Sequence, residues 1–150
     1  MRSELRRLLG PARIDVVWKN STQRRAGEAF DFVVVGSIEG SCSAAADLTE
    51  VPEPHGAVRL ADTSVSENHV LPFFVVDCPH VIWALGNETV PSAVGRALAR
   101  VIGHELYHIL TKTTEHRHAG IAKAVFSIQD LVSPGLDFDS RSLSQMRSIS

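Results

Sequence analysis

The stretch that decides the fold runs from residue 99 to residue 110 and reads ARVIGHELYHIL. Its apolar spacing predicts an α-helix, and four helical residues turn about 400°, so His104 and His108 lie about 40° apart on one face. Both imidazoles can then reach one ion. Zn²⁺ binds neutral His nitrogens at about 2.0–2.1 Å, and a catalytic site keeps one position for water. Glu105, rotated about 60–100° from the histidines, can accept a proton from that water. The spacing therefore predicts two metal ligands and one general base on a single helix.

The same five residues, HELYH, would also fit a buried helix that carries two hydrogen-bonded histidines and no metal. Three features favour the metal site: the segment has helical periodicity, its flanks are apolar, and further histidines follow at His116 and His118. The apolar flanks are Val101, Ile102, Ile109 and Leu110. We therefore interpret the motif as a metal site, a hypothesis that its structural context can test.

This motif resembles the active-site helix of the zincin superfamily of zinc-dependent metallopeptidases, and the downstream histidine resembles the metzincin branch. Metzincins carry H-E-x-x-H-x-x-G-x-x-H, in which the glycine lets the chain turn. Here Thr111 stands at the glycine position, and His116 follows His108 by eight residues instead of six. With Gly120 to Lys123 included, the pattern is similar to small bacterial zincin-like proteins. The resemblance covers roughly a fifth of the 150 residues.

The resemblance implies that Zn²⁺ is held by His104, His108 and His116. A straight continuation of the helix would carry His116 about 18 Å along its axis from His104. The chain must therefore reverse within residues 111–114, a threonine-rich run that forms helix poorly. The alternatives for the third ligand are His118, Glu115 and Asp130.

The function that the resemblance implies is zinc-dependent hydrolysis of peptide bonds by a metalloendopeptidase, with Glu105 as the general base. Its substrate would be a peptide or protein bound in extended form. A second hypothesis is a non-catalytic zinc-binding or interaction domain that keeps the zincin fold, and a third is a metal-free structural protein. Zinc content separates the third hypothesis from the others, and turnover of an unbiased peptide library separates the first two.

Length and composition are consistent with one domain over residues 1–150, because a chain of this size can bury a substantial core without disulfides. The sequence is 44% hydrophobic and 21% charged, with a net charge of −2. This balance indicates neither a nucleic-acid nor a membrane partner. No membrane-length apolar run and no signal peptide is visible, so the compartment stays open, as does the oligomeric state.

Cysteine usage is sparse, with Cys42 and Cys78 as the only two. They could form one disulfide, or they could be two buried thiols, which we favour from the sequence alone. Their separation excludes C-x-x-C spacing, so a cysteine-based zinc site is not expected.

Four strands are predicted from β-rich runs, at residues 14–18, 29–35, 57–60 and 70–76. Pro72 cannot donate a hydrogen bond to a ladder, so we place residues 70–76 at an edge of the sheet. An edge strand can recruit an extended peptide, and we expect the site to lie in a cleft between this strand and the central helix. The region from Gly40 to Gly56 is rich in breakers and is predicted to be a flexible loop.

Helices are predicted at residues 2–9, 91–110 and 119–132, with a further short helix capped near Ser140. The segment 91–110 has apolar residues on two sides, so we expect it to be buried against the sheet. The predicted fold is α+β and zincin-like: a twisted mixed sheet of about four strands packed on a long active-site helix, with a small C-terminal helical part.

The remaining histidines and a methionine are assigned no role at the metal. His55, His69 and His80 occur singly in loop or strand surroundings and are interpreted as surface or core residues. Met146 could lie under the metal site as the methionine turn does in metzincins, but we interpret it as a packing residue.

Overall fold

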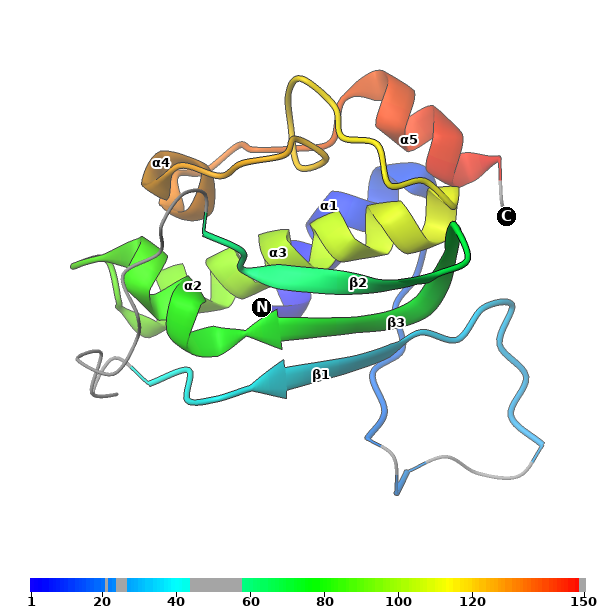
Figure 1. Cartoon of the computed structure of the whole chain (residues 1–150), viewed down its shortest axis with the longest axis horizontal. Coiled ribbons are helices and arrows are strands. Elements are labelled where there is room, and N and C mark those ends of the chain that lie inside the picture. Colours follow the sequence, from blue (N-terminus) through cyan, green and yellow to red (C-terminus); the bar gives the residue numbers. More distant parts are fainter. Residues whose placement is uncertain (21, 24–26, 44–57, 149–150) are drawn as a thin grey trace.

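The computed structural model describes residues 1–20, 22–23, 27–43 and 58–148. The architecture is α+β, with a three-stranded mixed sheet and helices packed on one side of it (Figure 1). The elements follow one another as α1 (Arg2–Leu9), η1 (Gly10–Ala12), β1 (Val35–Glu39), β2 (Ala61–Ser66), β3 (His69–Asp77), α2 (Cys78–Leu85), α3 (Pro91–Thr111), α4 (Ile128–Val132) and α5 (Ser140–Arg147). In the described residues the sheet therefore has three strands instead of the predicted four. None of the described helices is long and apolar enough to cross a membrane.

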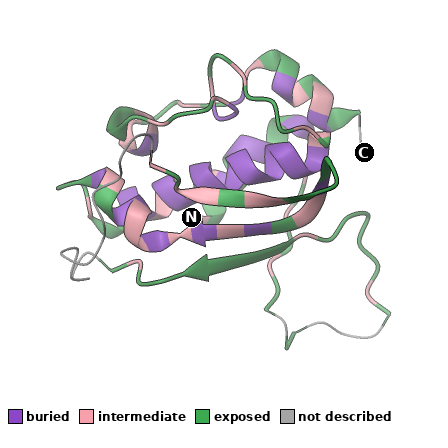
Figure 2. Cartoon of the chain, in the orientation of Figure 1, coloured by how far each residue is buried: buried purple, intermediate pink, exposed green. Residues whose placement is uncertain are grey.

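Helix α3 is the buried centre of the molecule, as its sequence predicts. Pro91 occupies the first turn, where its missing N–H breaks no helical bond, and Lys112 ends the helix with a left-handed φ of 53°. Every residue from Ala97 to Leu110 is buried (Figure 2). One side of α3 packs against Phe74 and Val76 of the sheet and the other against the apolar face of α1, so two of its faces are covered.

Strand β3 is the central strand, and the prediction that residues 70–76 lie at an edge is wrong. It pairs in parallel with β1 and antiparallel with β2. Pro72 is tolerated because pairing with β1 begins only at Phe73 and because the β2 register shifts between Thr63 and Val65, opposite Pro72. The missing N–H therefore falls at a bulge where no regular ladder bond is needed. Because both edges of β3 are paired, residues 70–76 cannot recruit an extended peptide as an edge strand would.

The other predicted strands are also misplaced. Residues 14–18 alternate between half-buried and exposed positions, yet they form no ladder and pack Ile14, Val16 and Trp18 against the core as an extended segment. The predicted strand at 29–35 overlaps β1 only at Val35, and β2 begins just after the predicted strand at 57–60. The loop predicted for residues 40–56 lies mostly outside the described residues. The β-propensity of these residues correctly indicated apolar, extended segments, but it could not indicate which segments pair in the sheet.

The segment after α3 is mostly not helical, and the helix predicted for residues 119–132 is wrong except at its end. Only α4 forms, with Ser127 and Asp130 completing a reciprocal capping box. The chain before it runs back along α3 in extended and turn conformations (Figure 1). Its apolar residues pack without a helical repeat because Ile121 and Ala122 are buried in one tight turn. The return path places residues 116–128 beside the histidine motif.

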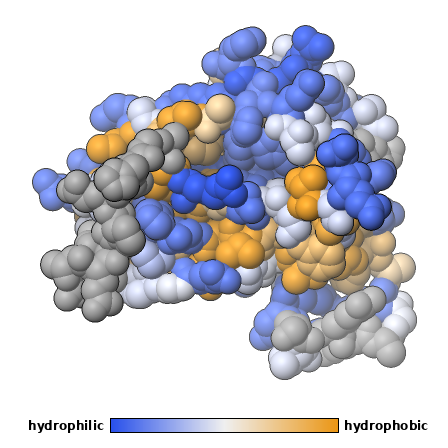
Figure 3. All heavy atoms as spheres, in the orientation of Figure 1, coloured by the Kyte–Doolittle hydropathy of each residue, from blue (hydrophilic) through white to orange (hydrophobic). Residues whose placement is uncertain are grey.

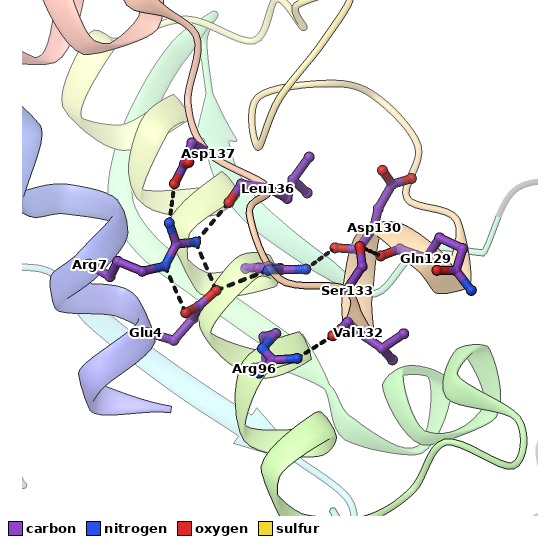
Figure 4. Close-up of polar contacts among 10 residues, drawn as sticks. Glu4, Arg7, Arg96, Gln129, Asp130, Val132, Ser133, Leu136 and Asp137 are labelled. Carbon is purple, nitrogen blue, oxygen red and sulfur yellow. Dashed lines mark hydrogen bonds and ion pairs between the residues drawn. The ribbon is translucent and has the colours of Figure 1, made fainter.

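A polar network fixes α4 and the chain that follows it, residues 130–137, to α1 and α3 (Figure 4). Arg100 of α3 is fully buried; its guanidinium contacts the Glu4 carboxylate at 3.1 Å and donates to the carbonyl of Asp130 at 2.6 Å. Arg7 of α1 donates to the carbonyl of Leu136 and to Asp137. The chain on both sides of Ser133 is therefore bonded to the helices that it covers.

The C-terminal helix and the two cysteines complete the fold. Helix α5 forms as predicted, capped by Asp139, and Met146 is buried in the core as we interpreted it.

Cys42 and Cys78 form a disulfide, so the preference for two thiols is wrong. Cys78 is the first residue of α2, a helix that the sequence analysis did not predict, and the bond ties it to the chain that leaves β1.

Candidate metal centre

Three histidines meet over the C-terminal half of α3. His104 and His108 come from the helix and are buried, whereas His116 comes from the returning chain and is exposed. One ring nitrogen of each lies within 4.8 Å of those of the other two. The His116 ring stacks on that of His104 at 5.2 Å between centroids and meets that of His108 edge to face at 4.8 Å. These three residues could hold a metal ion.

The position of His116 depends on a reversal at the threonine run, as predicted. Lys112 takes up the left-handed conformation, and the N–H of Thr113 donates to the carbonyl of His108 at 3.2 Å. The Thr113 hydroxyl then accepts from the N–H of Glu115 at 3.0 Å. Lys112 thus supplies the turning residue that a glycine supplies in the metzincin pattern.

In each buried histidine a backbone carbonyl fixes which ring nitrogen carries the hydrogen of the neutral ring, because that carbonyl accepts from Nδ1. His104 donates to the carbonyl of Ile121 and His108 donates to the carbonyl of Thr113, both at 2.8 Å. A carbonyl oxygen can only accept, so both imidazoles carry their hydrogen on Nδ1 and present a lone pair on Nε2. Metal-bound histidines commonly have such partners, because these orient the ring and select the tautomer.

The two Nε2 atoms face one another at 3.0 Å. Burial lowers the pKa of His104 to about 4 and also lowers the pKa of His108, so both rings are neutral at pH 7 and no proton is available to bridge them. Two lone pairs at this distance repel unless a cation lies between them. Nitrogens at 2.0–2.1 Å from a tetrahedral ion lie roughly 3.3–3.4 Å apart, which is close to the observed spacing. The donor set and its geometry therefore fit a metal ion.

Glu105 is buried beside the histidines and turned toward strand β2. Its Oε2 atom accepts a hydrogen bond from the Thr63 hydroxyl at 2.5 Å. Burial raises the pKa of the Glu105 carboxyl to about 7, and the Thr63 hydrogen bond opposes this shift. The Glu105 carboxyl is not one of the clustered groups that could hold a metal ion. Because its pKa is about 7, it can exchange a proton near pH 7.

A cleft of about 740 Å³ opens onto these residues. His104, Glu105 and His108 line its floor, β2 forms one wall, and the returning chain from Thr114 to Ile128 forms the other. Apolar side chains contribute much of the lining, including Trp83, Val101 and Phe126. The cleft lies between the central helix and an edge strand, as expected, but the strand is β2.

The remaining candidates lie outside the cluster in the part of the chain that is described. Asp130 is engaged with Lys123 and with the cap of α4, and neither His118 nor Glu115 joins the three histidines. His80 pairs with Asp77, His69 bonds the carbonyl of Glu67, and His55 lies outside the described residues.

Two contributions were missed by the sequence analysis. Thr63 lies 42 residues from Glu105 and belongs to no motif, so only the three-dimensional pairing reveals it. The carbonyls of Ile121 and Thr113 are backbone groups, so no residue type in the sequence indicates their role.

Comparison with protein-family models, curated proteins and solved structures found no match to this chain. The metal-site hypothesis therefore depends on the geometry described above.

Proposed function

We propose that this protein is a zinc-dependent metalloendopeptidase, a hydrolase in which His104, His108 and His116 hold the ion and Glu105 is the general base. The observation that carries the proposal is the pair of buried, neutral imidazoles whose Nε2 lone pairs face each other at 3.0 Å. An all-imidazole donor set suits Zn²⁺ among the available divalent metals, although Cu, Fe and Ni also accept imidazole. Zn²⁺ in a three-histidine site leaves a position open for chemistry.

The chemistry that zinc supplies, when bound, is polarisation of a carbonyl oxygen and a lowered pKa for a bound water, toward about 7. The remaining steps belong to this chain. Glu105 lies one residue from His104 and has a carboxyl whose pKa is about 7, so it can take the proton of the attacking water and hand it to the leaving amine.

Strand β2 supports an extended peptide substrate. It lies at an edge of the sheet and, in the described residues, pairs with β3 alone; Ala61, Asp62, Thr63 and Val65 all line the cleft. Free backbone groups of an edge strand can pair with a peptide in β conformation. The apolar lining from Trp83, Val101 and Phe126 favours substrates with an apolar side chain next to the scissile bond.

The proposal is tested by metal analysis followed by turnover. We expect about one zinc per chain in protein purified without chelator, with anomalous diffraction at the zinc edge locating it between the three histidines. An unbiased peptide library should then be cleaved by the wild type. Glu105→Gln keeps the size and shape of the side chain but cannot accept the proton. It should keep its zinc and lose roughly 10²–10⁴-fold in rate.

Three outcomes contradict the proposal in different ways. Zinc without cleavage of any peptide would indicate the non-catalytic zinc-binding domain. Equal cleavage by wild type and Glu105→Gln, both loaded with zinc, would show that Glu105 is not the base. Absence of zinc and of any other bound metal would remove the metal site itself.

A further inference from the structure

Thr63 is the residue of β2 that reaches the candidate centre. Its hydroxyl lies 2.5 Å from Glu105 Oε2 and 3.5 Å from the Glu105 backbone carbonyl. Both neighbours are acceptors when the carboxylate is ionised, so the hydroxyl is the donor. A separation this short is typical of a hydroxyl that donates to a charged carboxylate.

The local geometry of β2 aims Thr63 at the helix. Thr63 pairs with Phe74, whose side chain is buried toward α3, and the register of the ladder shifts directly after this pair. Two residues later, Val65 is 48% exposed. The register shift directly after Thr63 is therefore the feature that sets its side chain apart, since β-bulges often re-aim a side chain beside a functional site.

No other side chain competes for this role in the described part of the chain. The charged residues that precede Thr63, Arg59 and Asp62, pair with each other at 2.7 Å, and both are mostly exposed. Thr63 supplies the one described side-chain hydrogen bond to the Glu105 carboxyl.

We infer that Thr63 is a positioning residue: its hydroxyl holds Oε2 of Glu105 against the wall of the cleft and leaves Oε1 free for proton transfer. Because Thr63 belongs to the edge strand, a peptide that pairs with β2 steadies the same residue that orients the base. Substrate docking and alignment of the base are therefore coupled through one hydroxyl. This inference rests on the proposed peptidase function.

The hydrogen bond can be tested without any substrate. Thr63→Val removes the hydroxyl and keeps the shape, Thr63→Ser keeps the hydroxyl, and Ser133→Ala is a matched control that removes a hydroxyl bonded within α4. In zinc-loaded protein labelled with ¹³C at the glutamate carboxyl carbon, the Glu105 resonance is identified by its loss in Glu105→Gln. We expect this resonance to move in Thr63→Val and to stay in place in Thr63→Ser and Ser133→Ala. An unmoved resonance in Thr63→Val overturns the inference.

Kinetics test the consequence for catalysis. With zinc content and melting temperature matched to wild type, Thr63→Val should lower kcat roughly 10- to 100-fold, as expected for a misplaced catalytic group, with KM changed less than about twofold. Thr63→Ser should recover most of the loss. In the Glu105→Gln background, Thr63→Val should have no further effect, because the two residues act as one unit.

The outcomes separate this inference from the proposed function. An equal loss in Thr63→Ser and Thr63→Val, or a full additional loss in the Glu105→Gln background, overturns the positioning role. If the wild type cleaves no peptide, the proposed function fails, and the carboxyl resonance still decides whether Thr63 holds Glu105.

Discussion

The rings of His104 and His108 are oriented as metal ligands would be, by backbone groups far from them in sequence or just beyond the helix. Each ring is buried, each gives its Nδ1 hydrogen to a carbonyl, and each is left with a lone pair on Nε2. His116 has no such partner in the described residues and is exposed, so in a zinc site of these three residues it would be the ligand most easily displaced. Metal affinity should therefore depend on how firmly the return segment holds His116.

We predict that His116→Ala sharply reduces zinc occupancy, whereas His118→Ala does not. His118 is also exposed and lies outside the cluster, so it is the matched control for removing a histidine from this segment. Zinc content after dialysis against a weak chelator is the measurement. The opposite order would move the third ligand to His118, and equal, negligible losses would point to a carboxylate ligand.

In the metal-free protein, the buried carboxyl of Glu105 should make the free energy of unfolding depend on pH. Its pKa rises from a reference of 4.5 to about 7 on folding, so its contribution to stability is complete below pH 4.5 and is lost as pH rises through 7. The lowered pKa of His104, about 4, acts in the opposite direction between pH 6.5 and 4. Comparison with Glu105→Gln isolates the glutamate, because both proteins contain His104.

We predict that metal-free Glu105→Gln gains roughly 2–4 kcal/mol relative to wild type between pH 4.5 and pH 8. Urea unfolding in the presence of EDTA, at steps of half a pH unit, measures the difference. A difference that does not change with pH would show that the Glu105 carboxyl is not buried without its metal.

Much of this centre could be predicted from sequence because helix geometry alone fixes the relative positions of two side chains that are four residues apart. His104, Glu105 and His108 needed no tertiary information beyond the helix. His116 required the family resemblance, since only the reversal at Lys112 brings it back. Thr63 and the carbonyl of Ile121 could not be predicted, because their positions depend on strand pairing and on a loop path that no local pattern encodes.

At the scale of elements, the helical repeat of apolar residues correctly predicted the helices that are buried along one continuous face. Helices α1 and α3 formed as predicted, whereas residues 119–132 carry a helical repeat and yet turn tightly at residues 117–123. Gly120 adopts a φ of +73° there, and a Cβ at this residue would lie 2.5 Å from the carbonyl oxygen of Asp137. A turn that tertiary contacts require thus overrides a local helical pattern.

We predict that Gly120→Ala costs at least about 2 kcal/mol of stability, from the left-handed backbone and the backbone clash together. Gly135→Ala is the control: its φ is +88° and no atom lies within 4 Å of a Cβ there, so only the backbone term of about 1–2 kcal/mol remains. Because the next residue, Ile121, holds His104, Gly120→Ala should also weaken zinc binding. Thermal unfolding and zinc titration measure both effects, and equal costs for the two variants would contradict the close packing of Gly120.

At the scale of the whole molecule, two sets of long-range links tie together elements that are far apart in the sequence. The arginine network joins α1, α3 and the chain around α4, which is the wall that carries His116 (Figure 4). The disulfide joins the chain after β1 to the start of α2, next to central strand β3. On the outer face of the sheet, no helix of the described residues covers the strands: apolar side chains gather there (Figure 3), and Val35 and Phe73 are about half exposed.

The disulfide should contribute substantially to stability, since it joins two cysteines 36 residues apart. Loop-closure entropy for a crosslink of this span corresponds to about 3–4 kcal/mol, mainly by restricting the unfolded chain. We predict that Cys42→Ala/Cys78→Ala loses this amount in urea unfolding. Wild type in excess reductant should fall to a similar stability, while the double variant should not respond to reductant. Because the bond lies away from the three histidines, zinc content at low temperature should be unchanged. A loss below about 1 kcal/mol would contradict a stabilising role for the crosslink.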